Sequence, residues 1–359
     1  MTYWYLGPQH VVQLVREKFP EVPVILGGVY ASILPEHAKE VIRPDFIIEG
    51  PGEWKVLHLL NSLFNLNSER EPPSINLDDY PYPAFDLIPN PNYLCIMTAR
   101  GCPYNCSFCA QKQIAMSFSQ RDPEKVIQEL VFQYTKYKIR DFAFYDDALF
   151  VNKEKHINVI LERIINTKLP LRLHTPNGLF VRDIDEKLAL LLNRANTKTI
   201  RLSFETSNEN RHQDMFNKIS NESMRDAVKN LKKAGYKTSE LEAYVIMGLP
   251  DQNLDEILES IVFINNLGVQ VRLASYSPIP GTLDFRRAVE RGLISEDLDP
   301  LLTNKTIFPL RNQDLDYDTY RRVRIFSQML NEAAQKSFAP FAENTIGRSL
   351  RRILRDYSE

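Results

Sequence analysis

Six short apolar runs, rich in β-branched and aromatic residues, recur along the middle of the chain with a helical pattern between successive runs. The runs cover residues 94–98, 141–145, 171–175, 199–204, 241–247 and 271–276. Amphipathic stretches separate them at about 122–138, 153–166, 185–194, 220–234 and 253–267. This alternation predicts an α/β fold, because a helix is the usual connection between two parallel strands. The pattern fits a six-unit β/α barrel or an open doubly wound sheet, and in both folds ligands gather at the carboxyl ends of the strands.

A smaller alternation precedes this core, within residues 1–64. It consists of a helical stripe over 11–19, strands at 22–28 and 45–50, a helix at 34–42 and a third strand candidate at 2–5. Two or three strands are too few for a complete doubly wound domain. We therefore expect a partial α/β half-domain in front of the core.

Composition suggests the remaining boundaries. Residues 65–92 are polar and proline-rich, and such a stretch can continue neither a helix nor a central strand, so we expect a surface linker. The core then spans residues 93–283. Residues 284–359 are charged and predict a mainly helical C-terminal extension, whose strongest helical segment is 315–335.

Charge and cysteine usage exclude several classes of protein. The chain of 359 residues carries 44 Lys and Arg against 46 Asp and Glu, a net charge of −2, which argues against nucleic acid or an anionic membrane as a partner. No window approaches the roughly 20 apolar residues of a membrane helix, and the N-terminus lacks the pattern of a signal peptide. Three of the four cysteines fall within eight residues, which is not a disulfide framework. We expect a cytoplasmic protein.

The three clustered cysteines lie in the segment TARGCPYNCSFCAQ, directly after the first strand of the core. Cys102, Cys106 and Cys109 have a C-x3-C-x2-C spacing, and three thiolates on one short loop can converge on neighbouring irons of one iron–sulfur cluster. A structural zinc site would need a fourth ligand, and no second C-x2-C or paired histidine motif follows. The fourth cysteine, Cys95, lies inside an apolar run and is predicted to be a small core residue.

The loop and its position resemble the radical S-adenosylmethionine (radical SAM) superfamily, over about residues 93–283. The resemblance implies a partial, six-unit β/α barrel of the radical SAM type. It implies a [4Fe–4S] cluster held by Cys102, Cys106 and Cys109, with one iron left open for S-adenosylmethionine. Phe108, which precedes the last cysteine, matches an aromatic position near the adenine.

Further motifs keep the order of this family. Asp146 and Asp147 in FYDDALFVN follow the second strand, where the family places polar groups for the methionine amino group. Their pattern is similar to the DD-x-F-x-x-N version of cobalamin-linked and methylthiotransferase-like branches. On the fourth strand the family often reads G-x-E-S, and its acid meets the ribose. Here the segment is SFET: Glu205 matches, whereas Ser203 and Thr206 depart from the pattern and are weaker assignments.

The last two motifs follow the fifth and sixth strands. VIMGLP resembles an apolar run that closes in Gly-x-Pro, and Gly248 would let the backbone approach the adenine. SPIPGT at 277–282 resembles the P-x-P-G-T turn of these branches. From residue types alone, paired aspartates after a strand are more often solvated loop or cap residues, and Gly248 could simply end a strand. His174 is kept in reserve because it is expected to end the third strand beside the pocket.

The resemblance implies reductive cleavage of S-adenosylmethionine to a 5′-deoxyadenosyl radical, which then acts on a substrate that the sequence does not identify. An unidentified one-electron donor is the implied partner. Alternatives are a methylthiotransferase-like enzyme, a zinc-binding module and a nucleotide-binding scaffold without chemistry. The methylthiotransferase alternative normally adds a domain with three more cluster cysteines and a basic RNA-binding barrel, and this chain shows neither.

The N-terminal segment VPVILGGVYASILPEHAKE resembles the second half of the cobalamin-binding domain found in front of many radical SAM enzymes. There a Gly-Gly pair after a strand lets the nucleotide tail of cobalamin lie against the backbone. The histidine-bearing D-x-H-x-x-G loop of the first half does not occur, and His10 stands in the wrong context to replace it. We expect either a truncated domain, or cobalamin binding that is lost or lacks a protein histidine. Bound cobalamin would indicate methyl transfer.

Overall fold

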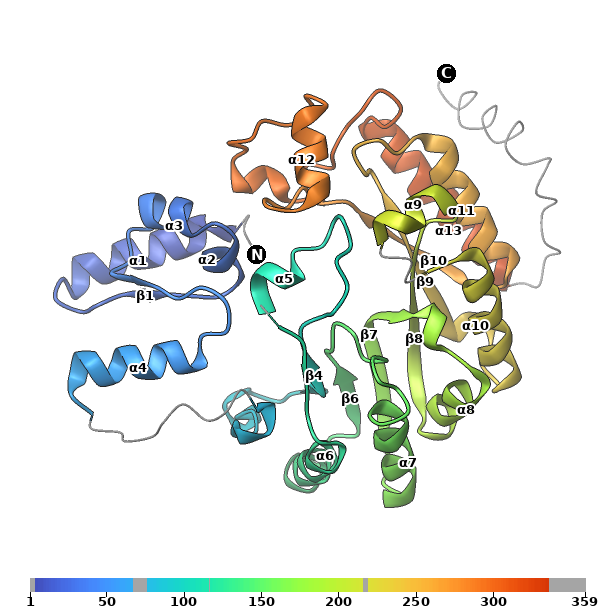
Figure 1. The fold of residues 1–359 in the computed structure, drawn as a ribbon, viewed down its shortest axis with the longest axis horizontal. Helices are drawn as coiled ribbons and strands as arrows, with labels where there is room; N and C mark the ends of the chain where they lie inside the picture. The colour runs from blue at the N-terminus through green and yellow to red at the C-terminus, as the bar shows by residue number, and fades with distance from the viewer. Residues whose placement is uncertain (1–3, 67–75, 116, 216–218, 336–359) are drawn as a thin grey trace.

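The computed structural model describes residues 4–66, 76–115, 117–215 and 219–335. A parallel six-stranded sheet in the order β3-β6-β7-β8-β9-β10 forms its centre. The strands are β3 (Leu94–Ile96), β6 (Asp141–Phe144), β7 (Arg172–Phe180), β8 (Thr197–Glu205), β9 (Leu241–Met247) and β10 (Gln270–Ser275). Strands β3 and β10 are the two edges of this sheet, so the barrel stays open (Figure 1). The structure thus confirms the predicted partial barrel.

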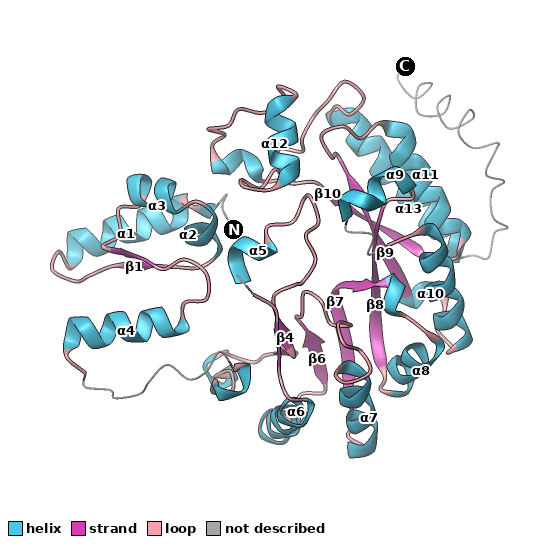
Figure 2. Ribbon diagram, in the orientation of Figure 1, coloured by secondary structure: helices cyan, strands magenta, loops and turns pink. Residues whose placement is uncertain are grey.

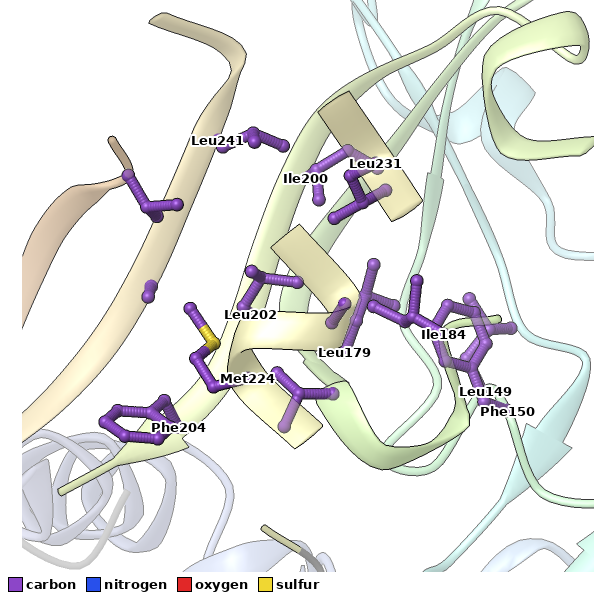
Figure 3. Close-up of a cluster of buried hydrophobic side chains, with 14 of the residues drawn as sticks. Leu149, Phe150, Leu179, Ile184, Ile200, Leu202, Phe204, Met224, Leu231 and Leu241 are labelled. Atoms are coloured by element: carbon purple, nitrogen blue, oxygen red, sulfur yellow. The ribbon is translucent and has the colours of Figure 1, made fainter. Parts of the chain in front are cut away.

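The helices between the strands cover one side of the sheet (Figure 2). They are α6 (Pro123–Tyr137), α7 (Ile157–Thr167), α8 (Glu186–Arg194), α10 (Asn221–Lys233) and α11 (Leu254–Asn266). Strand side chains alternate between the two faces. Figure 3 shows one buried row, Ile200, Leu202 and Phe204 of β8, beside Met224 and Leu231 of α10. The main hydrophobic core therefore lies between the sheet and its helices.

Local sequence signals explain where these helices begin. Ser220 accepts a hydrogen bond from the backbone of Ser223, and the Ser223 side chain accepts one from the Ser220 backbone, which makes a capping box at the start of α10. Asn253 caps α11 by accepting a bond from the backbone of Glu256. Both caps confirm the predicted helix starts.

The opposite, inner face of the sheet is polar near the beginnings of its strands. His174 Nε2 lies 3.0 Å from Asp141 Oδ1, and His174 Nδ1 lies 3.0 Å from Thr199 Oγ1. On the next pair of strands, Arg201 Nε donates to Glu242 Oε2 at 2.8 Å. The expected place of His174 at the end of the third strand is wrong, because β7 continues to Phe180 and leaves His174 near its start.

The N-terminal segment forms a small separate layer. Strand β1 (Ile25–Leu26) pairs in parallel with β2 (Phe46–Ile47). Around this pair lie α1 (Leu6–Lys18), α2 (Val29–Ile33), α3 (Pro35–Val41) and α4 (Glu53–Phe64). Trp4 and Tyr5 form a helical turn instead of the expected third strand, and residues 2–3 lie outside the described residues. The layer's own core is small and contains Tyr5, Val12, Tyr30, Ala38 and Ile42.

Two polar contacts join this layer to the barrel. Arg100, on a short strand β4 (Ala99–Arg100), donates to Glu53 at the start of α4 at 2.6 Å. The Tyr5 hydroxyl donates to Asp299 at 3.3 Å. The expected linker is described from residue 76 onward, and its short helical turns at Leu77–Asp79 and Phe85–Leu87 lead into β3. The domain boundaries at 64, 92 and 283 stay predictions.

The described part of the C-terminal extension has two α-helices, as expected, joined by turns and loops over residues 291–316. It contains α12 (Leu283–Glu290) and α13 (Tyr317–Gln335), and residues 336–359 lie outside the described chain. The Asn331 side chain of α13 bonds both the backbone N–H and the carbonyl of Val271, at 2.8 and 2.9 Å, so it covers part of edge strand β10. Across the described ranges, no helix has the length and apolar character needed to span a membrane.

Candidate active site

The predicted site residues lie at or directly after the carboxyl ends of parallel strands, so the fold brings them to one edge of the sheet. The cysteine loop follows β3 and β4, Asp146 and Asp147 follow β6, and Glu205 ends β8. Parallel strands point the same way, and their carboxyl ends are where α/β folds build ligand sites. Residues that are far apart in the sequence can form one site only if they lie at the same edge of the sheet, and these do.

The cysteine loop runs from β4 to α5 (Gln111–Ala115), and β4 pairs antiparallel with β5 (Ser119–Gln120) just beyond it. Gly101 opens the loop with φ at +82°, and a Cβ there would lie 2.3 Å from the carbonyl oxygen of Ser117. Only glycine fits this close approach. Within the loop, Cys109 N–H donates to Cys106 O at 3.1 Å. Cys106 is buried, Cys102 half-buried and Cys109 exposed.

Ser107, between the second and third cysteines, fixes this loop to two distant segments. Its hydroxyl donates to Asp284 Oδ2 at 2.7 Å, and its carbonyl accepts from Asp284 N–H at 3.0 Å. Its own N–H donates to Asp214 O at 3.1 Å. Arg287 bridges the two aspartates, with contacts of 2.7 Å to Asp214 and 3.0 Å to Asp284. Burial raises the pKa of Asp284, and the bonds from Ser107 and Arg287 partly offset that rise.

The donor set of this loop suits a cluster better than a single ion. Among the described residues, no group of three or more His, Cys, Asp and Glu side chains is gathered as a single metal ion would require. A cubane spreads its thiolate ligands over different irons, so their sulfurs need not meet at one point. A hollow of about 150 Å³ adjoins Cys102, between Pro103, Gln111 and Phe118. Three thiol side chains on one anchored loop beside such a hollow fit an iron–sulfur cluster.

Asp146 is buried and its carboxylate is already engaged. It accepts bonds from the Thr98 N–H at 3.0 Å and from the Thr98 hydroxyl at 2.6 Å. Burial raises the pKa of Asp146 to about 6, although the Thr98 bonds favour the charged form. Asp146 therefore holds the end of β3 where the chain turns into the cysteine loop. A direct contact between Asp146 and the methionine amino group stays a prediction.

Asp147 lies closer to the cysteine loop. Its carboxylate accepts from Gln111 Nε2 at 2.5 Å, and Gln111 is the first residue of α5. Burial raises its pKa, with the Gln111 bond and the Gly101 backbone acting in the opposite direction. Of the two aspartates, Asp147 is thus the one that meets the loop that carries the cysteines.

Glu205 ends β8 in an unusual backbone conformation. Its φ is +74°, in a region that non-glycine residues rarely occupy, and the pairing of β8 with β9 is irregular between Ser203 and Glu205. Ser203 Oγ donates to Glu205 Oε1 at 2.8 Å, and both side chains are buried. Strained residues of this kind concentrate at functional sites. Ser203 and Glu205 are therefore held together at the end of β8, and a contact of either side chain with the ribose stays a prediction.

The remaining predicted residues are placed differently. The space beside Gly248 is filled by Tyr320 of α13, because a Cβ on Gly248 would lie 1.8 Å from the Tyr320 hydroxyl oxygen. Gly248 has a packing reason to be glycine, and its approach to adenine stays a prediction. Phe108 is half-buried and packs against the main core. Thr206 bonds Glu256 at 3.0 Å on the helical side.

Cys95 packs against the main core, as expected of a small core residue, but it is only half-buried and also lies beside a cavity of about 750 Å³ between β3 and α4. Burial raises the pKa of its thiol, and the Tyr145 hydroxyl hydrogen-bonds to it. The alternation of β3 explains this partial exposure, because Leu94 and Ile96 take the two buried positions and Cys95 falls on the inner face.

Two residues of the site were missed from the sequence. Asp284 stands in the first turn of α12, where an acid usually just complements the helix dipole, and nothing local predicts a contact with Ser107. Gln111 follows the cysteines directly, but a glutamine carries no pattern of its own. Only the fold brings these side chains to the loop.

Comparison with known proteins agrees with this architecture. Residues 96–264 match the family model described as the Radical SAM superfamily. An uncharacterised methyltransferase of Pyrococcus horikoshii is 27% identical over 79% of this chain and 67% of its own length. An anaerobic magnesium-protoporphyrin IX monomethyl ester cyclase of Rubrivivax gelatinosus is 26% identical over 76% of this chain. The chain spans only 54% of that cyclase.

A solved structure shares the overall fold. The radical S-adenosylmethionine methyltransferase TsrM from Kitasatospora setae, with tryptophan and a SAM analogue bound, superposes with a TM-score of 0.70. The match covers 97% of this chain and 83% of TsrM at 14% sequence identity. At that identity the likeness concerns the fold alone.

The open six-stranded barrel, the cysteine loop after its first strand and the family match define an enzyme of the radical SAM class. Residues 96–264 form a radical SAM domain. Its cofactors are accordingly a [4Fe–4S] cluster and S-adenosylmethionine.

Proposed function

We propose that Cys102, Cys106 and Cys109 are the three ligands of the [4Fe–4S] cluster, and that the chain cleaves S-adenosylmethionine reductively there. The observation that carries the proposal is the anchored loop after edge strand β3. Within it, the hydroxyl of Ser107 donates to the Asp284 carboxylate, and the Ser107 carbonyl accepts from the Asp284 N–H. When bound, the cluster supplies one electron to the sulfonium group, and the broken carbon–sulfur bond leaves a radical at the adenosyl 5′ carbon. An external one-electron donor, which remains unidentified, must supply that electron.

The chain's own residues would bind and orient S-adenosylmethionine. The buried carboxylate of Glu205, set by Ser203, would accept hydrogen bonds from the ribose hydroxyls. Asp147 would accept a bond from the methionine ammonium, on the side where it already meets Gln111. The Asp146–Thr98 bonds fix where β3 ends and so set the start of the cysteine loop. Rigid placement of this kind lets a protein aim a reactive intermediate at one bond.

Methyl transfer to an unidentified substrate is the finer proposal. It is supported by the similarity to the methyltransferase of Pyrococcus horikoshii and by the fold shared with TsrM. A second structure of TsrM contains bound cobalamin. In the N-terminal layer, Gly28 between β1 and α2 has φ at +89°, and nothing lies within 4 Å of the place where its Cβ would be. This open backbone suits the nucleotide tail of cobalamin. We therefore propose that the nucleotide tail of cobalamin rests on this backbone.

The test begins with anaerobic reconstitution of the full chain. Wild type should bind iron and sulfide and, with dithionite as the electron donor, release 5′-deoxyadenosine from S-adenosylmethionine. Alanine at Cys102, Cys106 or Cys109 should remove the cluster, whereas Cys95→Ala, the matched control, should keep it. Loss of the cluster in the Cys95 variant, or its survival in any of the other three, would refute the ligand assignment.

Methyl transfer needs a separate measurement. Hydroxocobalamin is added to the full chain and the absorbance followed. Stoichiometric binding, weakened when Gly28→Val covers the open backbone, would support cobalamin-linked transfer. No binding would refute that finer proposal and leave the cleavage reaction in place.

A further inference from the structure

The cavity of about 750 Å³ lies between the N-terminal layer and the inner face of the open barrel. Trp54 and Leu57 of α4 line one side, Tyr80 of the connector a second, and Cys95, Met97 and Tyr145 of the sheet a third. A volume of this size is typical of pockets for small molecules, which run from about 300 to 1,000 Å³. The proposed function uses none of these six side chains.

The inner-face side chains of this cavity are apolar or aromatic, yet they are uncovered. Met97 is 39% exposed and Tyr145 43% exposed, although each stands at a strand end in the middle of the molecule. Leu57, facing them from α4, is 46% exposed. Apolar surface left open inside a fold marks a place where a ligand is buried.

The charged side chains that line the cavity disfavour an anionic ligand. Arg100 is paired with Glu53 at 2.6 Å, and Arg121 is paired with Asp78 at 2.8 Å and Glu129 at 2.5 Å. Both arginines lining the cavity are therefore engaged, so a carboxylate or phosphate entering it would have to break an ion pair. The rings of Trp54 and Tyr80 lie 6.4 Å apart and tilted by 36°. Rings at such separations bind other rings by stacking or by their edges.

We propose that this cavity is the substrate pocket and that the part of the substrate that enters it is a neutral aromatic ring system. The inference rests on the proposed function for its link to chemistry. Arg100, in the cavity wall, stands two residues before Cys102, so this wall continues along the chain into the cysteine loop. Cys95 and Met97 approach it from strand β3, which leads into that loop.

Two dyes with one ring skeleton test the class of ligand. N-phenyl-1-naphthylamine is neutral, and 8-anilinonaphthalene-1-sulfonate adds a sulfonate. The neutral dye should bind the full chain with saturable fluorescence at one site, about tenfold more tightly than the anionic dye, which corresponds to about 1.4 kcal/mol. Equal binding of the two dyes, or tighter binding of the anionic dye, would refute the proposal that the cavity takes a neutral ring system.

Location is tested at Cys95. The neutral dye should slow alkylation of Cys95 by N-ethylmaleimide, followed by peptide mass spectrometry, in step with its occupancy. Met97→Trp should fill the cavity and lower dye affinity by about tenfold. Met329→Trp on the exposed side of α13 should leave it unchanged. Dye binding without protection of Cys95 would place the dye elsewhere and overturn the inference.

The two proposals fail in different ways. If the dye binds as expected but 5′-deoxyadenosine is never formed, the cavity stands as a site for a neutral aromatic ring, and its role as a substrate pocket falls with the proposed function. If 5′-deoxyadenosine forms but the dye neither binds nor protects Cys95, only the pocket is refuted. Displacement of the dye by stoichiometric hydroxocobalamin would assign the cavity to a cofactor and refute its role as the substrate pocket.

Discussion

The Ser107 hydroxyl donates to Asp284 at 2.7 Å, across 177 positions of sequence. Ser107 stands inside the cysteine loop, and Asp284 opens the helix that follows the last strand of the barrel. The loop after the first strand is therefore fastened to the end of the barrel. If the loop were flexible, cluster binding would have to order it and would lose conformational entropy. The Ser107–Asp284 bond reduces this cost because it orders the loop beforehand.

Replacement of Asp284 should weaken cluster retention. Asp284→Ala removes a charge-assisted bond of about 1.5–3 kcal/mol and leaves the Ser107 hydroxyl without its partner. We expect less iron and sulfide per chain after gel filtration, whereas Asp284→Asn, which keeps an acceptor, should retain most of both. Asp318→Ala, in the first turn of α13, is the matched control. Equal retention in Asp284→Ala and wild type would contradict the role of this bond.

Asp146 should make stability depend on pH. Its pKa is about 6 in the folded chain, against 3.8 for an aspartate in the unfolded chain, because burial disfavours the charged form. Between these values the unfolded chain loses the proton and the folded chain keeps it, so stability falls as pH rises and levels off above about 6. The full effect is about 3 kcal/mol.

The comparison variant for Asp146 is Asp146→Asn, which does not titrate. The thermal unfolding midpoint of wild type minus that of Asp146→Asn should decrease from pH 4 to pH 7. A difference that stays constant or grows with pH would show that the buried carboxyl group does not carry this proton.

Glu205 should contribute to both stability and S-adenosylmethionine binding. Its φ of +74° suits glycine, so Glu205→Gly relieves about 1 kcal/mol of backbone strain. The same change breaks the buried bond from Ser203, which costs about 1.5–3 kcal/mol, and removes the carboxylate proposed to bind the ribose. We expect a lower unfolding midpoint together with weaker S-adenosylmethionine binding in equilibrium dialysis. Glu205→Gln keeps the backbone and should weaken binding without raising the midpoint, and unchanged binding in both variants would place the ribose elsewhere.

Gly248 and Tyr320 should be energetically coupled. A Cβ at residue 248 would meet the Tyr320 hydroxyl oxygen at 1.8 Å, and φ there is +95°. Gly248→Ala should therefore destabilise the fold by about 2 kcal/mol or more. Tyr320→Phe removes the clashing oxygen, so the double variant should be more stable than the sum of the two single changes predicts. Additive effects in a double-mutant cycle would contradict this contact.

Most of the barrel could be predicted because its signals are local. Apolar runs predict the strands, and pairs such as Ser220 and Ser223 mark where helices begin. The end of β7 could not be predicted in this way. Pro176 and Gly178 look like the end of a strand, but β7 passes through them with an irregular register between Thr175 and Leu179 and continues to Phe180. A bulge tolerates both residues, and its presence depends on the neighbouring strands.

The spacing of the three cysteines is enough to predict a cluster loop, since three thiolates within eight residues have few other uses. Their role as ligands stays a prediction. Spacing does not tell which way Asp146 and Asp147 point. The fold turns Asp146 toward Thr98 and Asp147 toward Gln111, and this choice depends on how β6 lies beside β3.

The bond from Tyr5 to Asp299 has a consequence for how the chain is made. A ribosome releases Asp299 only 294 positions after Tyr5. Leu301, which packs on the same small core, emerges just as late. The N-terminal layer therefore emerges well before the surface on which it finally rests. Nascent chains cut before residue 299 should be more sensitive to proteases in this layer than the finished protein.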